Sequence, residues 1–377
     1  MARRNAIGTT LEADSDSKTS FTPDKFFDNW QNGTLRPPYD GNFRKFILSS
    51  FGLPPSDTYI YKAVAEISLL QAQTYMDFGA QGRLHEWYRD AEGKQREPPP
   101  AVDIAAYSNV FSPDTRTQNA IKTLMSNAKK DTLRREIATH LDSQFQAPKE
   151  DSKLILPKKA KKPHVNPYLD IWAWSNIALE WGGPEATTAQ IKHSHAILPI
   201  LYHHFGCIVP SYDALNVIQQ VGKGRKIIDL GSGNGYWTYM LRRFDRELNP
   251  QGGKNAMTVI PVDNGLSEWR TIWVDDTVLQ DGVEWLEQNK GAEDAVLLLV
   301  YPQVSEDLTG RAIGAYKGDT IVVAGTQNAN GFTAFADETI SAWMQREMPS
   351  SSKVLQIPLP SFAGKDEALF VFRKTSS

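Results

Sequence analysis

The chain of 377 residues contains only one cysteine, Cys207. A single cysteine excludes an intramolecular disulfide and any zinc site built from several thiolates. No H-E-x-x-H pattern is present, and the side chains of His193 and His195 would point apart on a helix. We therefore expect no metal site. The lack of disulfide chemistry favours a reducing compartment, and we expect a cytoplasmic protein.

Long hydrophobic runs are also missing. No apolar stretch approaches the roughly 20 residues that a membrane-spanning helix needs, so we expect no membrane partner. Residues 1–20 carry Arg3 and Arg4, followed by acidic residues and no apolar segment. This pattern does not fit a signal or transit peptide, and we expect a disordered tail.

The chain has little excess of either charge, because its positive and negative residues nearly balance and the formal net charge is only -3. Such a balance does not favour nucleic-acid binding over the whole surface. Residues 148–167 are different, since they concentrate four prolines and the six lysines 149, 153, 158, 159, 161 and 162. We predict a solvated, proline-stiffened linker here. A nuclear localisation signal and a contact with RNA phosphates are the alternatives, so RNA is a possible partner and the nucleus a second location.

The part of the chain before residue 221 shows helical periodicity and few strand-like runs. We expect a tail at 1–20, a helical domain at 21–147, the linker at 148–167 and an aromatic-rich helical bridge at 168–220. In the helical domain Asp57 can cap a helix that runs through Ile60 to Leu70, and Asp114 can cap one that runs through Ile121. A third helix is expected through residues 133–141.

Strands and helices alternate from residue 221 to the end, which is typical of a parallel sheet with crossover helices. Apolar, β-branched runs predict strands at 226–230, 257–262, 278–280, 295–300 and 320–324. Two further runs, at 354–357 and 368–372, predict an antiparallel hairpin. The expected fold class is α/β, with a mostly parallel sheet in a domain at 221–377 that follows the helical domain.

A glycine-rich loop joins the first of these strands to the next helix, in the sequence Asp229-Leu230-Gly231-Ser232-Gly233-Asn234-Gly235. Glycines allow a tight turn, and the helix N-terminus offers unpaired N–H groups to a ligand. A dinucleotide fingerprint would need a third glycine at position 236, which is occupied by Tyr236. The NAD interpretation is therefore disfavoured. A glycine-rich turn without a ligand is the other alternative.

The D-x-G-x-G-x-G spacing resembles motif I of the class I, Rossmann-like S-adenosylmethionine-dependent methyltransferases, and the resemblance covers about residues 221–373. It implies S-adenosylmethionine as cofactor. The resemblance implies that the methionine end of the cofactor lies against the loop residues Asp229, Gly231, Ser232, Gly233, Asn234 and Gly235. Asp263, at the end of the second strand, is then expected to accept the ribose hydroxyls, and Asp281 the adenine amino group. Asp275 and Asp276 compete with Asp281 for the adenine role. Asp263 and Asp281 could instead cap helices.

The acceptor is not identified by the sequence. Tyr301-Pro302-Gln303 follows the fourth strand, where amino-directed members of this superfamily often carry [N/D]-P-P-[Y/F], so their substrate class cannot be carried over. Candidates for orienting or deprotonating a nucleophile are Tyr301, His203 and His204. Gln303, Gln327, Asn328 and Asn330 are expected to line the substrate site, with ordinary packing and turn roles as the alternatives.

The sequence thus predicts an S-adenosylmethionine-dependent methyltransferase whose acceptor is RNA, protein or a small molecule. The main alternative is a catalytically inactive subunit that binds the cofactor or a partner. A nucleotide-dependent oxidoreductase is the third interpretation, which the residue at position 236 disfavours.

Overall fold

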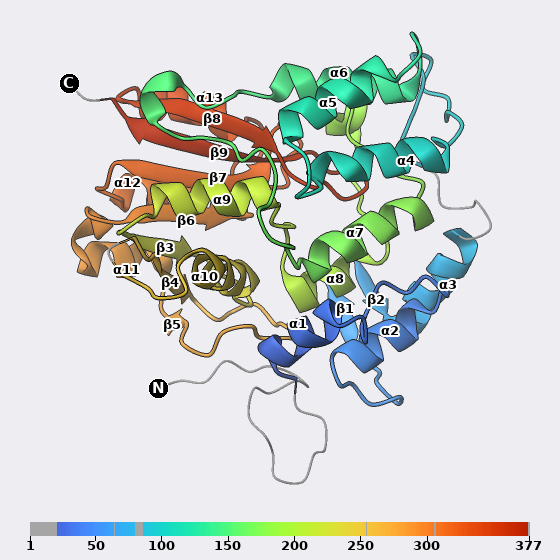
Figure 1. Ribbon diagram of the computed structural model, residues 1–377, viewed down its shortest axis with the longest axis horizontal. Coiled ribbons are helices and arrows are strands. Elements are labelled where there is room, and N and C mark those ends of the chain that lie inside the picture. The colour runs from blue at the N-terminus through green and yellow to red at the C-terminus, as the bar shows by residue number, and fades with distance from the viewer. Residues whose placement is uncertain (1–20, 64, 80–85, 254, 305–306, 376–377) are drawn as a thin grey trace.

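The computed structural model describes residues 21–63, 65–79, 86–253, 255–304 and 307–375, so the expected tail at 1–20 lies outside the described residues. The centre of the described part is a seven-stranded sheet in the order β5-β4-β3-β6-β7-β9-β8 (Figure 1). Its strands are β3 (Lys226–Leu230), β4 (Thr258–Asp263), β5 (Val278–Leu279), β6 (Val296–Val300), β7 (Thr320–Thr326), β8 (Ser351–Pro358) and β9 (Glu367–Lys374). Strands β3 to β7 are parallel, and β9 is antiparallel to both β7 and β8. The predicted mostly parallel sheet with a C-terminal antiparallel hairpin is confirmed.

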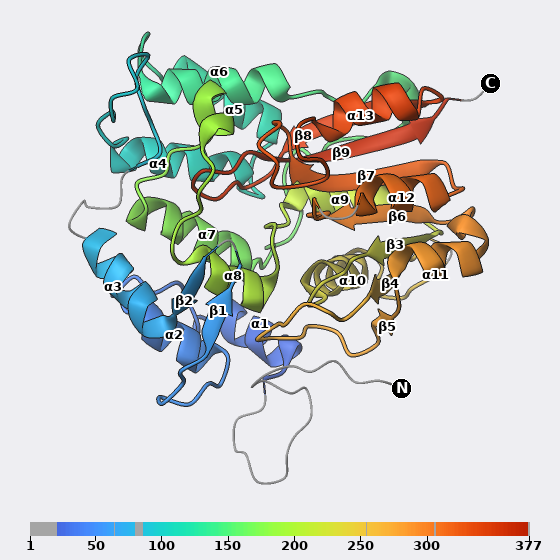
Figure 2. The ribbon, with the colours of Figure 1, turned by 180° about the vertical axis from the view of Figure 1, so that it is seen from behind.

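Helices cover both faces of the sheet, which explains why its central strands are apolar throughout. One face packs against α9 (Tyr212–Val221) and α10 (Tyr236–Leu248). The other face packs against α11 (Gly282–Gln288), α12 (Leu308–Ala315) and α13 (Ile340–Glu347), which lie in front in Figure 2. In β6, Val296 and Leu298 belong to the core on the first face, and Leu297 to the core on the second.

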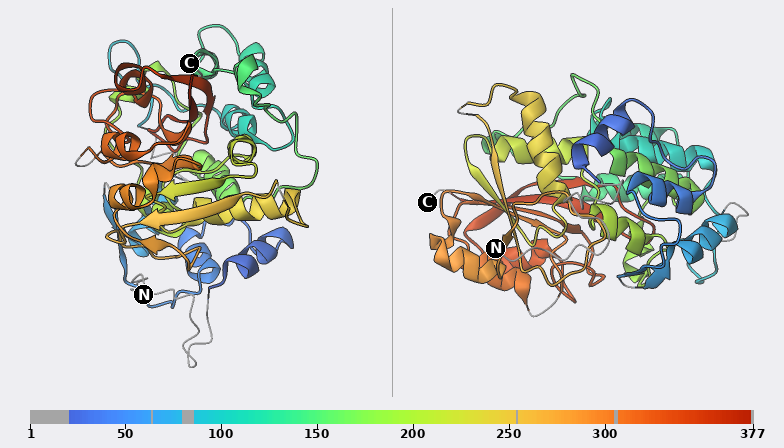
Figure 3. Two further views of the ribbon diagram at one scale, coloured as in Figure 1. Left: turned by 90° about the vertical axis from the view of Figure 1, so that its left-hand side faces the viewer. Right: turned by 90° about the horizontal axis from the view of Figure 1, so that it is seen from below.

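The remaining helices gather beyond one end of the sheet, on the side away from α11 and α12 (Figures 1 and 3). They are α1 (Pro23–Gln31), α2 (Phe43–Ser50), α3 (Leu69–Gly79), α4 (Ala101–Ser108), α5 (Thr117–Ser126), α6 (Leu133–Gln144), α7 (Pro167–Ala178) and α8 (Leu198–Phe205). Short 3-10 turns occur at Asn109–Phe111, Glu150–Ser152, Ala186–Gln190 and Lys290–Ala292. Helices α5 and α6 confirm two of the predicted helices, although Arg116 rather than Asp114 precedes α5.

The helix predicted after Asp57 is wrong. The segment forms a short antiparallel hairpin of β1 (Ile60–Lys62) and β2 (Glu66–Ser68). Burial alternates along it, with Tyr61 buried and Ile60 exposed, which is the period of a strand. Asp57 caps no helix and instead forms a buried ion pair with Arg270. Tertiary contacts therefore override the apolar spacing that indicated a helix.

The predicted solvated linker at 148–167 is only partly correct. Lysines 158, 159, 161 and 162 are exposed, as expected. The stretch before them is docked, because Leu154 and Leu156 are buried in the core, and Ile155 exchanges hydrogen bonds through its backbone with the Gln220 side chain. Alternating apolar residues beside the lysines fix this segment to α9.

The hydrophobic core is continuous between the helices and the sheet. A single cluster of buried residues includes Phe26 of α1, Trp172 of α7, Leu298 of β6 and Val371 of β9. The predicted boundaries at 147, 167 and 220 therefore do not separate cores. Among the helices described, none combines the length and the apolar character that crossing a membrane requires.

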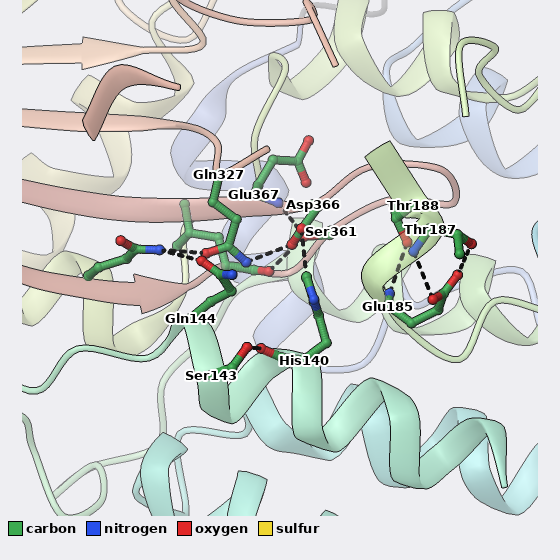
Figure 4. Close-up of polar contacts among 12 residues, drawn as sticks. His140, Ser143, Gln144, Glu185, Thr187, Thr188, Gln327, Ser361, Asp366 and Glu367 are labelled. Carbon is green, nitrogen blue, oxygen red and sulfur yellow. Dashed lines mark hydrogen bonds and ion pairs between the residues drawn. The ribbon is translucent and has the colours of Figure 1, made fainter. Parts of the chain in front are cut away.

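A polar network joins α6 to the beginning of β9 (Figure 4). His140 Nε2 lies 2.8 Å from Asp366 Oδ2, and Gln327 Nε2 donates to Asp366 Oδ1 over 2.6 Å. Gln356 of β8 in turn donates to Gln327 Oε1 over 2.9 Å. The network ties the helical part to the sheet through a carboxylate that is 1% exposed.

We expect His140 to make folding stability depend on pH. Burial opposes protonation of His140, but the hydrogen bond and the charge of Asp366 outweigh it, so its pKa is raised. A raised pKa gives stability that is fully present below the pKa of the unfolded chain, about 6.5, and is lost as pH rises through the folded value. His140→Gln should therefore lower the free energy of unfolding at acidic pH by about 1.5 kcal/mol, as for a charged hydrogen bond, and by less at alkaline pH.

Urea denaturation of the wild type and the variant, at pH 5.5 and 8.5, measures this difference. Ser143→Ala is the matched control, because Ser143 lies on the exposed side of the same helix. An equal loss of stability at both pH values would contradict the prediction.

Candidate functional site

The glycine loop between β3 and α10 has the backbone geometry that its composition predicts. Gly231, Gly233 and Gly235 all have left-handed φ values, between 56° and 82°. A Cβ atom at Gly235 would lie 2.4 Å from Val274 Cγ2, so only glycine fits there. A Cβ atom at Gly231 would meet nothing within 4 Å. The backbone at Gly231 is therefore bare on the side where a ligand can approach it.

The loop forms one wall of a cavity of about 340 Å³. The cavity lies at the carboxyl ends of β3, β4 and β6, the edge at which open α/β sheets bind ligands. The predicted site residues in its wall are Asp229, Gly231, Ser232, Gly233, Asn234, Asp263, Asp281, Tyr301 and Gln303. Residues from three separate strand ends and one helix start thus meet around a single cavity.

Three carboxylates line the cavity, and backbone or hydroxyl donors fix each of them. Asp263 accepts hydrogen bonds from the N–H groups of Gly233, over 2.9 Å, and Gly265, over 2.8 Å. Asp229 is fully buried and accepts from Thr238 Oγ1 over 2.6 Å. Asp281 Oδ1 accepts from two N–H groups and caps α11. This cap agrees with the alternative role considered for Asp281 and leaves the residue in the cavity wall.

The cavity wall fits S-adenosylmethionine better than a dinucleotide. Three carboxylates favour a cationic sulfonium and an ammonium group, whereas they would repel a pyrophosphate. Within the described residues, Ser232 Oγ and Asn234 Nδ2 are buried and have no hydrogen-bond partner. Buried polar atoms of this kind are rare in folded proteins unless a ligand or water satisfies them.

Tyr301 also lines the cavity, and its backbone is strained. Its φ of 49° is left-handed, which is rare for a residue with a large side chain. Burial raises the pKa of its phenol, so this group stays protonated and can donate a hydrogen bond. The ring of Tyr202 lies 5.7 Å away in an edge-on arrangement. Strain of this type is concentrated at functional sites.

His203 and His204 do not face the cavity. His203 bonds to Tyr59 through Nδ1 and to the Lys62 backbone through Nε2. His204 bonds to Thr271 through Nδ1 and to Tyr61 through Nε2. Burial lowers the pKa of both residues. All four ring nitrogens are thus engaged with Tyr59, the β1–β2 hairpin and Thr271, and this geometry does not support a general-base role.

The amide residues after β7 are not among the residues that line the cavity. Gln327 is part of the Asp366 network. Both polar side-chain atoms of Asn328 and the Nδ2 atom of Asn330 are buried, with no hydrogen-bond partner in the described ranges. A role for these residues in substrate binding stays a prediction.

Trp269 and Cys207 were not anticipated as cavity residues. A Cβ atom at Gly233 would lie 3.0 Å from Trp269 Cζ2, so the indole covers the glycine loop. The signal that could have found it is the long connection between β4 and β5, since long connections often carry function. The described chain contains no group of three or more His, Cys, Asp or Glu side chains that could hold a metal ion.

Comparison of the sequence with known proteins identifies no family for this chain. No family model matches the chain, and no curated protein matches it. Among solved structures, the chain is similar to the trans-methyltransferase CalH in complex with S-adenosylhomocysteine, with 12% identity and a TM-score of 0.30, covering 73% of this chain and 90% of that chain.

Two other solved structures cover less of the chain. The 1,6-didemethyltoxoflavin-N1-methyltransferase of Burkholderia thailandensis has 13% identity and a TM-score of 0.29, covering 42% of this chain and 75% of that chain. An S-adenosylmethionine-dependent methyltransferase of Agrobacterium tumefaciens has 11% identity and a TM-score of 0.24, covering 43% and 59%. The strand order, the glycine loop and the C-terminal hairpin of this chain give it the fold of the class I, Rossmann-like S-adenosylmethionine-dependent methyltransferases.

Proposed function

We propose that this protein is an S-adenosylmethionine-dependent methyltransferase. The observation that carries the proposal is the cavity itself, where a bare glycine loop and three fixed carboxylates meet at the carboxyl edge of the sheet. The charge of this wall complements a cationic cofactor. The strained Tyr301 lines the same cavity.

Each carboxylate has a distinct part in this proposal. Asp263 accepts from the ribose hydroxyls, Asp281 lies at the adenine end, and Asp229 lies at the methionine end with residues 231–234 of the loop. The cofactor supplies an electrophilic methyl group when it is bound. The contribution of the protein is to hold the nucleophile and the methyl group in line, which can supply a large part of the rate enhancement.

The acceptor is expected to approach past Tyr301 and Gln303. Gln303 is exposed and lies in the cavity wall, so its amide can meet a substrate at the mouth. The phenol of Tyr301 can donate a hydrogen bond to a carbonyl or hydroxyl of the acceptor and orient it. No general base is assigned by this geometry.

Isothermal titration with S-adenosylhomocysteine tests the proposal, with NADH as the parallel ligand. We expect micromolar binding of S-adenosylhomocysteine and no binding of NADH. An absence of heat with S-adenosylhomocysteine, in a folded sample free of co-purified ligand, would contradict the proposal. Binding without transfer of labelled methyl groups to RNA, protein or small-molecule pools would support the inactive, cofactor-binding alternative instead.

A further inference from the structure

The indole of Trp269 lies against the glycine loop with the side of the ring that carries its nitrogen. A Cβ atom at Gly233 would lie 3.0 Å from Cζ2, 3.3 Å from Cη2 and 3.7 Å from Cε2 of Trp269. Cε2 is bonded directly to Nε1, so these atoms belong to the N–H side of the indole. Trp269 and Gly233 both line the cavity of about 340 Å³. The indole N–H is therefore placed beside the loop in the cavity wall.

Three buried polar atoms around Gly233 lack hydrogen-bond partners. Ser232 and Asn234 flank Gly233 in the loop, line the same cavity, and are 9% and 2% exposed. In the part of the chain that the structure describes, Ser232 Oγ, Asn234 Nδ2 and Trp269 Nε1 are all buried without a partner. Folded proteins leave few such atoms unsatisfied unless a ligand or water binds there. Two separate segments of the chain thus contribute unused groups to one part of the cavity wall.

All three of these groups can donate a hydrogen bond. The indole N–H and the amide NH₂ group can only donate, and the serine hydroxyl can donate or accept. The N–H of Tyr236 donates to Asn234 Oδ1 over 3.2 Å, which fixes the amide so that its NH₂ group is the one left over. The missing partner is therefore an acceptor. A carboxylate matches three donors well, because its two oxygens together accept about four hydrogen bonds.

Trp269 is held in this position by the residues that follow it. The backbone N–H groups of Arg270 and Thr271 donate to the His203 carbonyl over 3.1 Å and 3.2 Å. The side chain of Arg270 forms the buried ion pair with Asp57. Because these contacts fix the chain on one side of the indole, its N–H loses little freedom when a ligand binds. Donors that are fixed in advance give more affinity for each hydrogen bond.

The proposed cofactor carries one carboxylate and one ammonium group, both at its methionine end. The ammonium group suits Asp229 at the start of the loop, whereas the carboxylate of the cofactor would be repelled by Asp229. It therefore needs donors in another part of the cavity wall. The three groups around Gly233 supply such donors from neutral side chains.

We propose that Trp269, together with Ser232 and Asn234, binds the carboxylate at the methionine end of the cofactor. The indole N–H donates one of the hydrogen bonds from a segment outside the glycine loop. The inference rests on the proposed function, because the carboxylate belongs to the cofactor of that function.

Isothermal titration with two ligands tests the inference. S-adenosylhomocysteine carries the carboxylate, and S-adenosyl-3-thiopropylamine is the same molecule without it but with the amino group retained. We expect the wild type to bind S-adenosylhomocysteine at least tenfold more tightly than the amine, as for the loss of a hydrogen bond to a charged group. Equal affinity for the two ligands would overturn the inference.

Trp269→Phe shows whether the indole N–H is responsible, because it keeps an aromatic ring over the loop and removes the donor. It should weaken the binding of S-adenosylhomocysteine about tenfold, and leave the affinity for the amine within about twofold. Trp343→Phe on α13 is the matched control, since the same substitution is made there at a residue that does not line the cavity. It should leave both affinities unchanged.

Ser232→Ala is an independent variant of the same pocket, and it removes a donor from the loop without changing the indole. It should also weaken the binding of S-adenosylhomocysteine selectively. Circular dichroism of each variant shows whether it is folded. If Trp269→Phe and Ser232→Ala weaken both ligands equally, or weaken neither, the groups only pack against the cofactor or bind water, and the inference is overturned.

The two proposals can fail separately. A wild-type protein that binds neither S-adenosylhomocysteine nor the amine overturns the proposed function and this inference with it. A wild-type protein that binds both ligands, with no preference for the one that carries the carboxylate, overturns this inference alone and leaves the proposed function standing.

Discussion

Replacing Asp263 by alanine is expected to weaken the binding of S-adenosylhomocysteine about 100-fold. The carboxylate is proposed to accept two charge-assisted hydrogen bonds from the ribose, each worth about 1.5 kcal/mol or more, and every 1.4 kcal/mol is tenfold in affinity. The substitution also removes the acceptor that holds the N–H of Gly233 in the glycine loop. Isothermal titration of the variant beside the wild type measures the loss.

Asp275→Ala is the matched control, because Asp275 is an exposed carboxylate on the connection between β4 and β5 and, unlike Asp281, is not part of the cavity wall. It changes the protein by the same charge and should leave the affinity within about twofold, as for a distant charge in water. Circular dichroism should show both variants folded. Wild-type affinity in a folded Asp263→Ala protein would remove the ribose role and weaken the proposed arrangement of the cofactor.

Replacing Trp273 by alanine is expected to lower the free energy of unfolding by about 3–5 kcal/mol, the usual cost of deleting a buried aromatic side chain. Trp273 is 2% exposed and contacts Phe26 and Phe27 of α1, Phe205 of α8 and Tyr236 of α10. Its indole Nε1 donates to the His204 carbonyl over 2.6 Å. One side chain therefore joins the helical part to the sheet and the glycine loop.

Urea denaturation followed by circular dichroism and fluorescence measures this loss, and we expect a single transition in both proteins because the core is continuous. Trp343→Ala on α13 is the matched control, since Trp343 is only partly buried and stacks on Phe335 outside this cluster. Its cost should be smaller. Two separate transitions in the wild type would show that the helical part and the sheet unfold independently, against this prediction.

The sequence alone determined the sheet and the glycine loop, because both depend on local signals. Apolar runs bounded by turn residues predicted β3, β4, β6 and β7, since a strand buried on both faces must be apolar at every position. The positions of the glycines predicted the left-handed loop, because only glycine adopts that backbone without strain. Asp263 and Asp281 could be placed by the ends of their strands, and the structure brings both into one cavity with the loop.

Only the tertiary structure decided how residues far apart in the sequence meet. The apolar spacing after Asp57 fits a helix, yet Asp57 pairs with Arg270, more than 200 positions later in the chain, and the segment forms a hairpin. His203 and His204 stand close to the glycine loop in the sequence, but they face that hairpin because α8 turns them away from the cavity. No local pattern records these orientations.

The buried residues Lys365 and Glu367 show the same limit. Lys365 and Glu367 belong to the loop and strand that close the chain, where the sequence indicates only an ordinary hairpin. Insertion of β9 beside β7 pairs Glu367 with Thr326, and both Lys365 and Glu367 are buried. The sequence therefore determined the conformation of the glycine loop, because backbone conformation is a local property. The folded chain decided which polar and charged groups are buried, because burial and charge pairing arise only when distant segments pack together.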